Sequence, residues 1–293
     1  MIETLHEPLF FYLFDRLKLL PVPPQDPSSS TSNGTHEKET VKLIDIAAGT
    51  GYLSVLLADA YEKADALDRL NIYASDFSSG IVATMKKRFE ERGWPTSRVK
   101  GDILDANDVD TLSSNTYTHA VCTGAIYFVK DPAKFVAELL RIIRPGGFIG
   151  LSSTARKDWL MPIAETLARI RKCSVDEIKL PSPYDPQWAD ESYFRELLKT
   201  AGFVDVETHM LNLDSFIIDN QHECARIFVG PPNGLTDPVL DINNVTEEER
   251  HQVPAVFKEV LQEMQGSDLD KPVHFAFATL VSIGVKPDES AIA

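Results

Sequence analysis

The sequence predicts an α/β protein in which strands and helices alternate along the first half of the chain. Short apolar runs rich in β-branched residues alternate with stretches in which apolar residues recur at helical spacing. The clearest case is the run at residues 41–46, which passes through a glycine-bearing turn into a helical pattern beginning near Leu53. Hydrophobic residues make up 43% of the 293 residues, which is enough for a sizeable core.

Five strands are expected in the first half of the chain. Each is a short apolar run followed by a polar or glycine-containing segment. The expected strands cover residues 41–46, 70–75, 98–101, 117–123 and 148–152. Their alternation with helices favours right-handed crossovers and therefore neighbouring parallel strands.

Two of the connecting helices carry clear boundary signals. After the second strand, Ser78 or Ser79 can cap a helix that runs to about Arg92 and ends at Gly93. After the fourth strand, Asp131-Pro132 combines an N-cap acid with proline at the first helical position. We therefore expect helices to begin at both places.

The N-terminal region and the second half of the chain are less regular. Residues 9–20 have the apolar spacing of an amphipathic helix, and residues 21–39 form a Pro/Ser-rich, flexible linker with nothing to bury. Further on, helices are expected near residues 159–172 and 192–200, and strands at residues 204–213 and 273–285.

The turn after the first strand has the composition of a ligand-binding loop. Small residues at 47–51 let a ligand approach the backbone, and the helix that follows directs its free N–H groups toward that ligand. A dinucleotide fingerprint requires a third glycine, but Ser54 stands there. Asp45 would also repel a pyrophosphate, whereas it suits an ammonium group. These features favour a ligand with a zwitterionic amino-acid tail over NAD, and a glycine-rich turn of another α/β protein stays as the alternative.

The run D-I-A-A-G-T-G at residues 45–51 resembles motif I of the class I S-adenosylmethionine (SAM)-dependent methyltransferases. Its form is similar to that of small-molecule enzymes such as the quinone C-methyltransferases. R-P-G-G at residues 144–147 and A-G-F at residues 201–203 resemble the same family. The resemblance implies a Rossmann-like seven-stranded sheet, mostly parallel with a C-terminal antiparallel hairpin and with helices on both faces. It also implies SAM as the cofactor and S-adenosylhomocysteine as the product.

The resemblance assigns roles to residues that follow the strands, where ligands of open α/β sheets bind. Asp76 is placed to accept hydrogen bonds from a ribose diol, and Phe77 to pack on the adenine. Asp102 would accept from the adenine amino group, and Ile103 would cover the ring. For each acidic residue considered alone, the alternative to a cofactor contact is a position in a solvated loop or at a helix cap. The full expected cofactor-binding set is Asp45, Ala47, Gly49, Thr50, Gly51, Asp76, Phe77, Asp102, Ile103 and Thr123.

The region around the fourth strand departs from related patterns. His119 is expected to be a structural histidine rather than a catalytic one. Residues 123–128 lack the N/D-P-P-Y motif of the amino-methylating nucleic-acid enzymes. Tyr127 is a candidate for the acceptor site, with core packing as the alternative. Methyl transfer to an activated acceptor requires no general base, and the sequence identifies no catalytic residue.

Composition restricts the partners. The net charge of −15, from 44 acidic and 29 basic residues, argues against nucleic acid or an anionic membrane. The three widely separated cysteines favour neither a disulfide framework nor a metal site, and they fit a reducing compartment. No apolar stretch reaches the ~18 residues of a membrane span, and the N-terminus does not resemble a signal peptide. A cytoplasmic protein of small-molecule metabolism is expected, with its oligomeric state left open.

These expectations give the following organisation. Residues 1–40 comprise an N-terminal helix and linker that cover the cofactor site, and residues 41–293 form the methyltransferase domain. Helical cap insertions at about residues 154–202 and 214–270 carry aromatic surface for a small-molecule acceptor, natural products included. The residues expected to supply it, each with core packing as the alternative, are Trp159, Met161, Trp188, Phe216 and Phe228. One alternative is a SAM-binding partner or regulator without methyl transfer. A less favoured one is an arsenite methyltransferase that uses the three cysteines.

Overall fold

The structure is a computed structural model that describes residues 6–21, 40–180, 185–230 and 236–288. The linker expected at residues 21–39 therefore lies outside the described residues apart from Pro21. The chain divides into two compact units. The first contains residues 1–153, 191–209 and 281–293, and the second contains residues 154–190 and 210–280.

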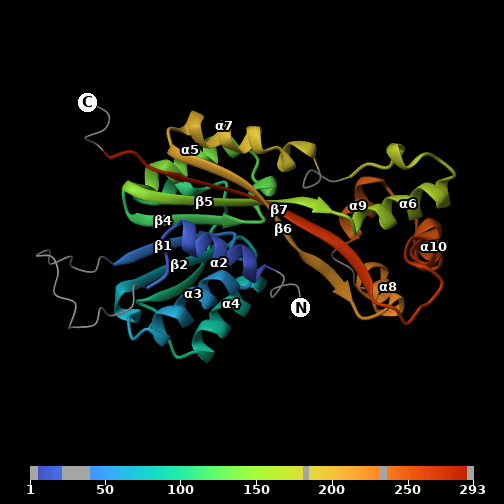
Figure 1. Cartoon of the computed structure of the whole chain (residues 1–293), viewed down its shortest axis with the longest axis horizontal. Helices are drawn as coiled ribbons and strands as arrows, with labels where there is room; N and C mark the ends of the chain where they lie inside the picture. Colours follow the sequence, from blue (N-terminus) through green and yellow to red (C-terminus); the bar gives the residue numbers. More distant parts are fainter. Residues whose placement is uncertain (1–5, 22–39, 181–184, 231–235, 289–293) are drawn as a thin grey trace, which may run out of the picture. The chain divides into compact units, whose positions relative to one another are not determined.

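The strands belong to one sheet in the order β3-β2-β1-β4-β5-β7-β6 (Figure 1). Their bounds are β1 Val41–Ile46, β2 Leu70–Asp76, β3 Val99–Ile103, β4 Tyr117–Thr123, β5 Ile143–Lys157, β6 Val204–Ile218 and β7 Val273–Val285. The pairs β1–β2, β1–β4, β2–β3 and β4–β5 are all parallel. The carboxyl ends of β1, β2, β3 and β4 therefore meet at one edge of the sheet.

Strand β7 reverses this direction. In Figure 1 the arrow of β7 points opposite to those of β5 and β6. At the start of β5, the amide of Gly146 donates to the Lys286 carbonyl over 2.9 Å, and the Lys286 amide donates to the Gly147 carbonyl over 2.8 Å. Such reciprocal bonds are the pattern of an antiparallel pair. The predicted mostly parallel sheet with antiparallel C-terminal strands is confirmed.

Among the described residues of the first unit, α5 and α7 lie on one side of the sheet and α2, α3 and α4 on the other (Figure 1). Their bounds are α2 Glu7–Arg16, α3 Tyr52–Lys63, α4 Ser79–Glu91, α5 Pro132–Ile142 and α7 Glu191–Ala201. The predicted start of α5 is confirmed, because the Asp131 side chain accepts a 3.0 Å hydrogen bond from the Lys134 amide.

The start of the fifth strand was predicted wrongly. Strand β5 begins at Ile143 and not at Phe148, because the R-P-G-G run forms its first residues instead of a loop before it. Gly146 has a φ of +71°, and a Cβ on Gly147 would lie 2.7 Å from the carbonyl oxygen of Thr118. The two glycines therefore permit the close, irregular pairing of β5 with β4.

Helix α2 is anchored to the sheet by the residues at its C-terminal end. The side chains of Leu13 and Leu17 occupy the space beside Gly150, and both are fully buried. The Leu17 carbonyl lies 2.9 Å from Nε2 of His119, whose other ring nitrogen lies 2.7 Å from Oγ1 of Thr118. Burial lowers the pKa of His119 to about 4. His119 is therefore the structural histidine that the sequence predicts.

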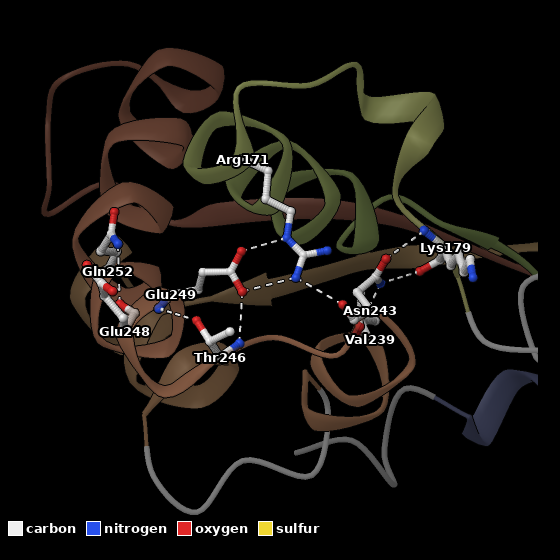
Figure 2. Close-up of polar contacts among 8 residues, drawn as sticks. All are labelled: Arg171, Lys179, Val239, Asn243, Thr246, Glu248, Glu249 and Gln252. Carbon is white, nitrogen blue, oxygen red and sulfur yellow. Dashed lines mark hydrogen bonds and ion pairs between the residues drawn. The ribbon is translucent and has the colours of Figure 1, made fainter.

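The second unit contains the described helices α6 Leu160–Arg171, α8 Gln221–Val229, α9 Asp237–Ile242 and α10 Glu247–Gln265. Arg171 joins α6 to α10 by two parallel bonds to Glu249, with its Nε 2.8 Å from Oε1 and its Nη2 3.0 Å from Oε2 (Figure 2). The same Nη2 donates to the Asn243 carbonyl over 2.9 Å. Thr246 and Glu249 also cap α10 reciprocally. The network fixes three segments to one another.

Aromatic residues predicted for the acceptor pocket form part of this unit's core. Phe228 is 1% exposed, and its ring centroid lies 5.5 Å from that of Trp159 and 5.7 Å from that of Phe275. Trp188 is 3% exposed, whereas Met161 is 49% exposed. Of Phe216 only the strand position is described. The assignment of residues 154–202 and 214–270 as caps stays a prediction.

Candidate functional site

The loop between β1 and α3 has an unusual backbone that is open on one side. Ala47, Gly49 and Gly51 have φ values of +55°, +57° and +76°. The Ala48 amide donates to the Ser75 carbonyl over 2.8 Å, which ties the loop to the end of β2. A Cβ on Gly49 would meet no atom within 4 Å, so space lies beside that residue. The loop can thus accept a ligand against its backbone.

Asp76, at the carboxyl end of β2, holds the loop. Its Oδ2 accepts a 3.1 Å hydrogen bond from the Gly49 amide, and its Oδ1 accepts a 3.0 Å bond from the Ser78 amide. The residue is 5% exposed. Each carboxylate oxygen retains acceptor capacity beyond these single bonds. The carboxylate is thereby fixed in orientation and can still accept hydrogen bonds from a ligand.

Asp45 lies near the carboxyl end of β1, just before the loop, and is fully buried. Its Oδ2 accepts a 2.7 Å hydrogen bond from the Ser54 hydroxyl, while its Oδ1 has no partner in the described structure. Burial raises the pKa of Asp45 to about 7, the Ser54 hydrogen bond opposes this rise, and the charge of Asp76 adds to it. An unpartnered buried carboxylate oxygen is costly, and a cationic group would relieve that cost.

The outer part of the site is apolar. Phe77 directly follows β2, and Ile103 is the last residue of the neighbouring β3; the two residues are 73% and 55% exposed. Ile103 pairs in register with Asp76 across β2 and β3. Exposed apolar side chains beside a fixed carboxylate suit a ligand that combines a flat ring with hydroxyl groups.

Asp102 also lies at the end of β3, where it pairs with two lysines. Its Oδ2 is 2.8 Å from Nζ of Lys100, and its Oδ1 is 4.0 Å from Nζ of Lys86. The bond from Lys100 is the main reason that the pKa of Asp102 is lowered. Its Oδ1 also accepts a 3.0 Å bond from its neighbour, the Ile103 amide. Asp102 is therefore ionised and available as an acceptor at neutral pH.

The end of β4 supplies a second aromatic group. After Thr123, the Gly124 amide donates to the carbonyl and to Oγ of Ser152, over 3.1 and 3.0 Å. The rings of Tyr127 and Phe128 meet edge to face with centroids 4.8 Å apart, and Phe128 is 68% exposed. An exposed aromatic side chain at this strand end extends the apolar surface available to a ligand.

The structure directly joins some of the predicted residues. Gly49 contacts Asp76, and Asp45 lies close enough to Asp76 for the two charges to interact. Sequence reasoning missed Arg88, whose Nη1 donates to Oγ1 of Thr50 over 3.2 Å. It also assigned no role to Ser54, although this residue stands at the third glycine position. The serine in place of the third glycine was the sequence feature that could have identified Ser54.

Among the described residues, no group of three or more His, Cys, Asp or Glu side chains could hold a metal ion. Cys122 and Cys224 are buried, and burial raises the pKa of both thiols. Within the described ranges, no helix has both the length and the apolar character needed to pass through a bilayer.

The donor set fits SAM. The unpartnered Oδ1 of Asp45 suits its ammonium group, and the fixed carboxylate of Asp76 suits its ribose hydroxyl groups. The space beside Gly49 leaves room against the loop backbone. Exposed Phe77 and Ile103 suit the faces of a purine ring.

Comparison with known proteins agrees with this fit. Residues 44–151 match the family described as a methyltransferase domain. Methyltransferase tpcH of Aspergillus fumigatus is 25% identical over 262 residues, which cover 86% of this chain and 87% of that protein. A demethylmenaquinone methyltransferase of Clavibacter sepedonicus is 23% identical over 176 residues, which cover 57% of this chain and 66% of that protein.

A solved structure shows the same fold. The Haemonchus contortus phosphoethanolamine N-methyltransferase 2, in complex with phosphomonomethylethanolamine and S-adenosylhomocysteine, aligns with a TM-score of 0.52 and 14% identity. The alignment covers 96% of this chain and 53% of that one. At this identity the likeness concerns the fold alone. The matched domain and the related enzymes support a class I SAM-dependent methyltransferase of the small-molecule type.

Proposed function

We propose that this enzyme binds SAM at the carboxyl ends of β1 to β4 and transfers its methyl group to a small metabolite, natural products included. One observation carries the assignment of the site. The carboxylate of Asp76 bridges the Gly49 and Ser78 amides beside the open face of the loop, where a Cβ on Gly49 would meet no neighbour. A ribose joined to an amino-acid tail requires a hydrogen-bond acceptor of fixed position next to open space along the backbone.

The proposal assigns a role to each residue at the strand ends. In this proposal Asp76 accepts from the ribose hydroxyl groups, and Phe77 and Ile103 flank the adenine. Asp102 accepts from the adenine amino group, because its carboxylate is ionised at the end of β3. Asp45, with the loop at residues 47–51 and Thr123, surrounds the amino-acid portion. When bound, SAM supplies an electrophilic methyl group on a sulfonium.

The chain's own contribution to catalysis is positioning and exclusion of water. Helix α2 takes part, because its Glu7 accepts a hydrogen bond from the Tyr52 hydroxyl at the start of α3. The ring of Phe10 in α2 lies 6.3 Å from that of Tyr52. In our proposal these contacts let α2 cover the cofactor loop from the side of α3.

The acceptor is proposed to be small and uncharged or weakly cationic. The net charge of −15 disfavours nucleic acid, whose binding needs basic side chains along a phosphate backbone. The aromatic pair Tyr127 and Phe128, after β4, offers apolar surface to a planar molecule. The relative from C. sepedonicus is named for a quinone substrate, demethylmenaquinone, which belongs to this chemical class. We place the reaction in the cytoplasm, in small-molecule metabolism.

The acceptor class can be tested with methyl-labelled SAM. The enzyme is incubated with a cell extract that has been separated into small metabolites, protein and nucleic acid. The proposal predicts label in an extractable small molecule, and no such label with the Asp76→Ala variant. Label confined to protein or nucleic acid would contradict the proposed acceptor. Binding of SAM without transfer to any fraction would favour a regulatory protein.

A further inference from the structure

One face of α4 supports the cofactor loop from behind. Met85, Arg88 and Phe89 are spaced i, i+3 and i+4, so they project from the same side of the helix. A Cβ on Gly51 would lie 2.8 Å from Cγ of Met85 and 3.0 Å from Cζ of Phe89. These two side chains therefore occupy the space next to Gly51 and restrict the loop on that side.

Arg88 makes polar contacts with both neighbours of Gly51. Its Nη1 donates to Oγ1 of Thr50 over 3.2 Å. Its guanidinium carbon lies 5.8 Å from the centroid of the Tyr52 ring, within the range of a cation–π interaction. Gly51 itself has a φ of +76°, so the loop reverses between the two contacted residues. One half-buried side chain thus constrains both sides of the turn.

Tyr52 extends this set of contacts to the N-terminal helix. Its hydroxyl donates to Oε1 of Glu7, and its ring lies beside that of Phe10. Arg88 of α4 therefore contacts Thr50 and Tyr52, and Tyr52 in turn contacts α2. All these residues belong to the first compact unit.

We propose that Arg88 is a positioning residue for the cofactor site, which orients Thr50 and Tyr52 and, through Tyr52, holds Glu7 of α2. This inference rests on the proposed function, because it takes the loop to be the SAM site. Arg88 contributes to cofactor binding and not to the methyl-transfer step itself. Its loss weakens binding of SAM and of S-adenosylhomocysteine, while turnover at saturating SAM is retained.

The test compares two arginines of the same helix end in the full-length protein. Arg92 also lies over an aromatic ring, 5.5 Å from the centroid of Trp94, but its polar partner is Asp59 of α3 and not a loop residue. Calorimetric titration with S-adenosylhomocysteine should show a Kd raised about fivefold or more for Arg88→Ala, the scale of one lost hydrogen bond. Arg92→Ala should leave the Kd unchanged. Arg88→Lys should recover part of the affinity, because it keeps the cation over Tyr52.

Hydrogen exchange of the ligand-free protein gives a second readout. In Arg88→Ala, amides of residues 49–54 and of α2 should exchange faster, whereas in Arg92→Ala they should match the wild type. Arg88→Lys serves the same comparison if the alanine variant does not fold. Equal Kd values and equal loop exchange in the Arg88 and Arg92 variants would overturn the inference. If the wild-type protein does not bind S-adenosylhomocysteine, the proposed function is wrong. That outcome is distinct from the comparison of the Arg88 and Arg92 variants, which tests only the role of Arg88.

Discussion

The Oδ2 atom of Asp76 accepts a 3.1 Å hydrogen bond from the amide of Gly49, although 27 positions separate the two residues in the chain. The bond links the end of β2 to the loop that follows β1. Because Oδ1 of the same carboxylate accepts from the Ser78 amide, Asp76 also fixes the start of the next helical segment. One side chain therefore organises the site and, in our proposal, contacts the cofactor.

Replacing Asp76 should weaken SAM binding without unfolding the protein. Asp76→Ala leaves charge-assisted hydrogen bonds unmade, a loss of about 1–3 kcal/mol of binding free energy. Asp76→Asn should also bind less well, because its amide nitrogen cannot accept from a backbone N–H. Asp105→Ala is the matched control, since Asp105 accepts from an amide two residues later, that of Asn107, as Asp76 does. An unchanged Kd in folded Asp76→Ala, measured by calorimetry, would remove Asp76 from the site.

Gly49→Val should abolish SAM binding. The branched side chain would occupy the open space beside the loop, and the φ of +57° is unfavourable for valine. Gly93→Val provides a control for backbone strain alone, because Gly93 has a φ of +69° and its Cβ would likewise meet no atom within 4 Å. Both variants should lose similar stability in urea unfolding, and only Gly49→Val should lose binding. SAM binding retained in Gly49→Val would contradict the assignment of the loop.

The buried carboxyl of Asp45 should make stability pH-dependent. Its pKa is about 7 in the folded protein, raised from 3.8, so the folded state holds a proton that the unfolded state releases. This contribution is fully present below about pH 4 and is lost as the pH rises through 7. Urea unfolding of wild type and Asp45→Asn from pH 4 to pH 8 measures it. The stability of the wild type relative to the variant should fall over this range, and a constant difference would contradict the raised pKa.

The ion pair of Arg171 and Glu249 should stabilise the folded protein more as the pH rises, which is the opposite of the Asp45 effect. The hydrogen bond from Arg171 lowers the pKa of Glu249 to about 2, so the contribution is present above the ordinary glutamate pKa and is lost as the pH falls toward 2. Glu249→Gln should destabilise the protein by about 1 kcal/mol at pH 7, and by less at pH 3. Glu223→Gln, which weakens the more exposed pair with Arg226, should have little effect. Equal losses for the two variants at pH 7 would contradict a role for the network in Figure 2.

Local sequence signals predicted much of the fold. The bounds of β4 and β7 were predicted correctly, and so was the start of α5 at Asp131. The start of β5 was not, because Pro145 and two glycines are typical of a loop. Pairing of that segment with Lys286 depends on a residue about 140 positions away, which no local pattern reveals.

The candidate site was predictable to a similar degree. Motif I and the strand ends indicate Gly49 and Asp76, because both depend on local order along the chain. The contact of Arg88 with Thr50 was missed, since it depends on how α4 packs against the loop. The unpartnered oxygen of Asp45 was missed as well, because burial on all sides follows only from the assembled sheet.

The central claim is that SAM binds at the carboxyl ends of β1 to β4. A crystal structure of the full-length protein with S-adenosylhomocysteine tests it most directly. The account predicts the ribose hydroxyl groups within hydrogen-bonding distance of Asp76, the adenine between Phe77 and Ile103, and the amino-acid tail against residues 47–51. A ligand bound elsewhere, or one bound at this edge without contact to Asp76, would contradict the account.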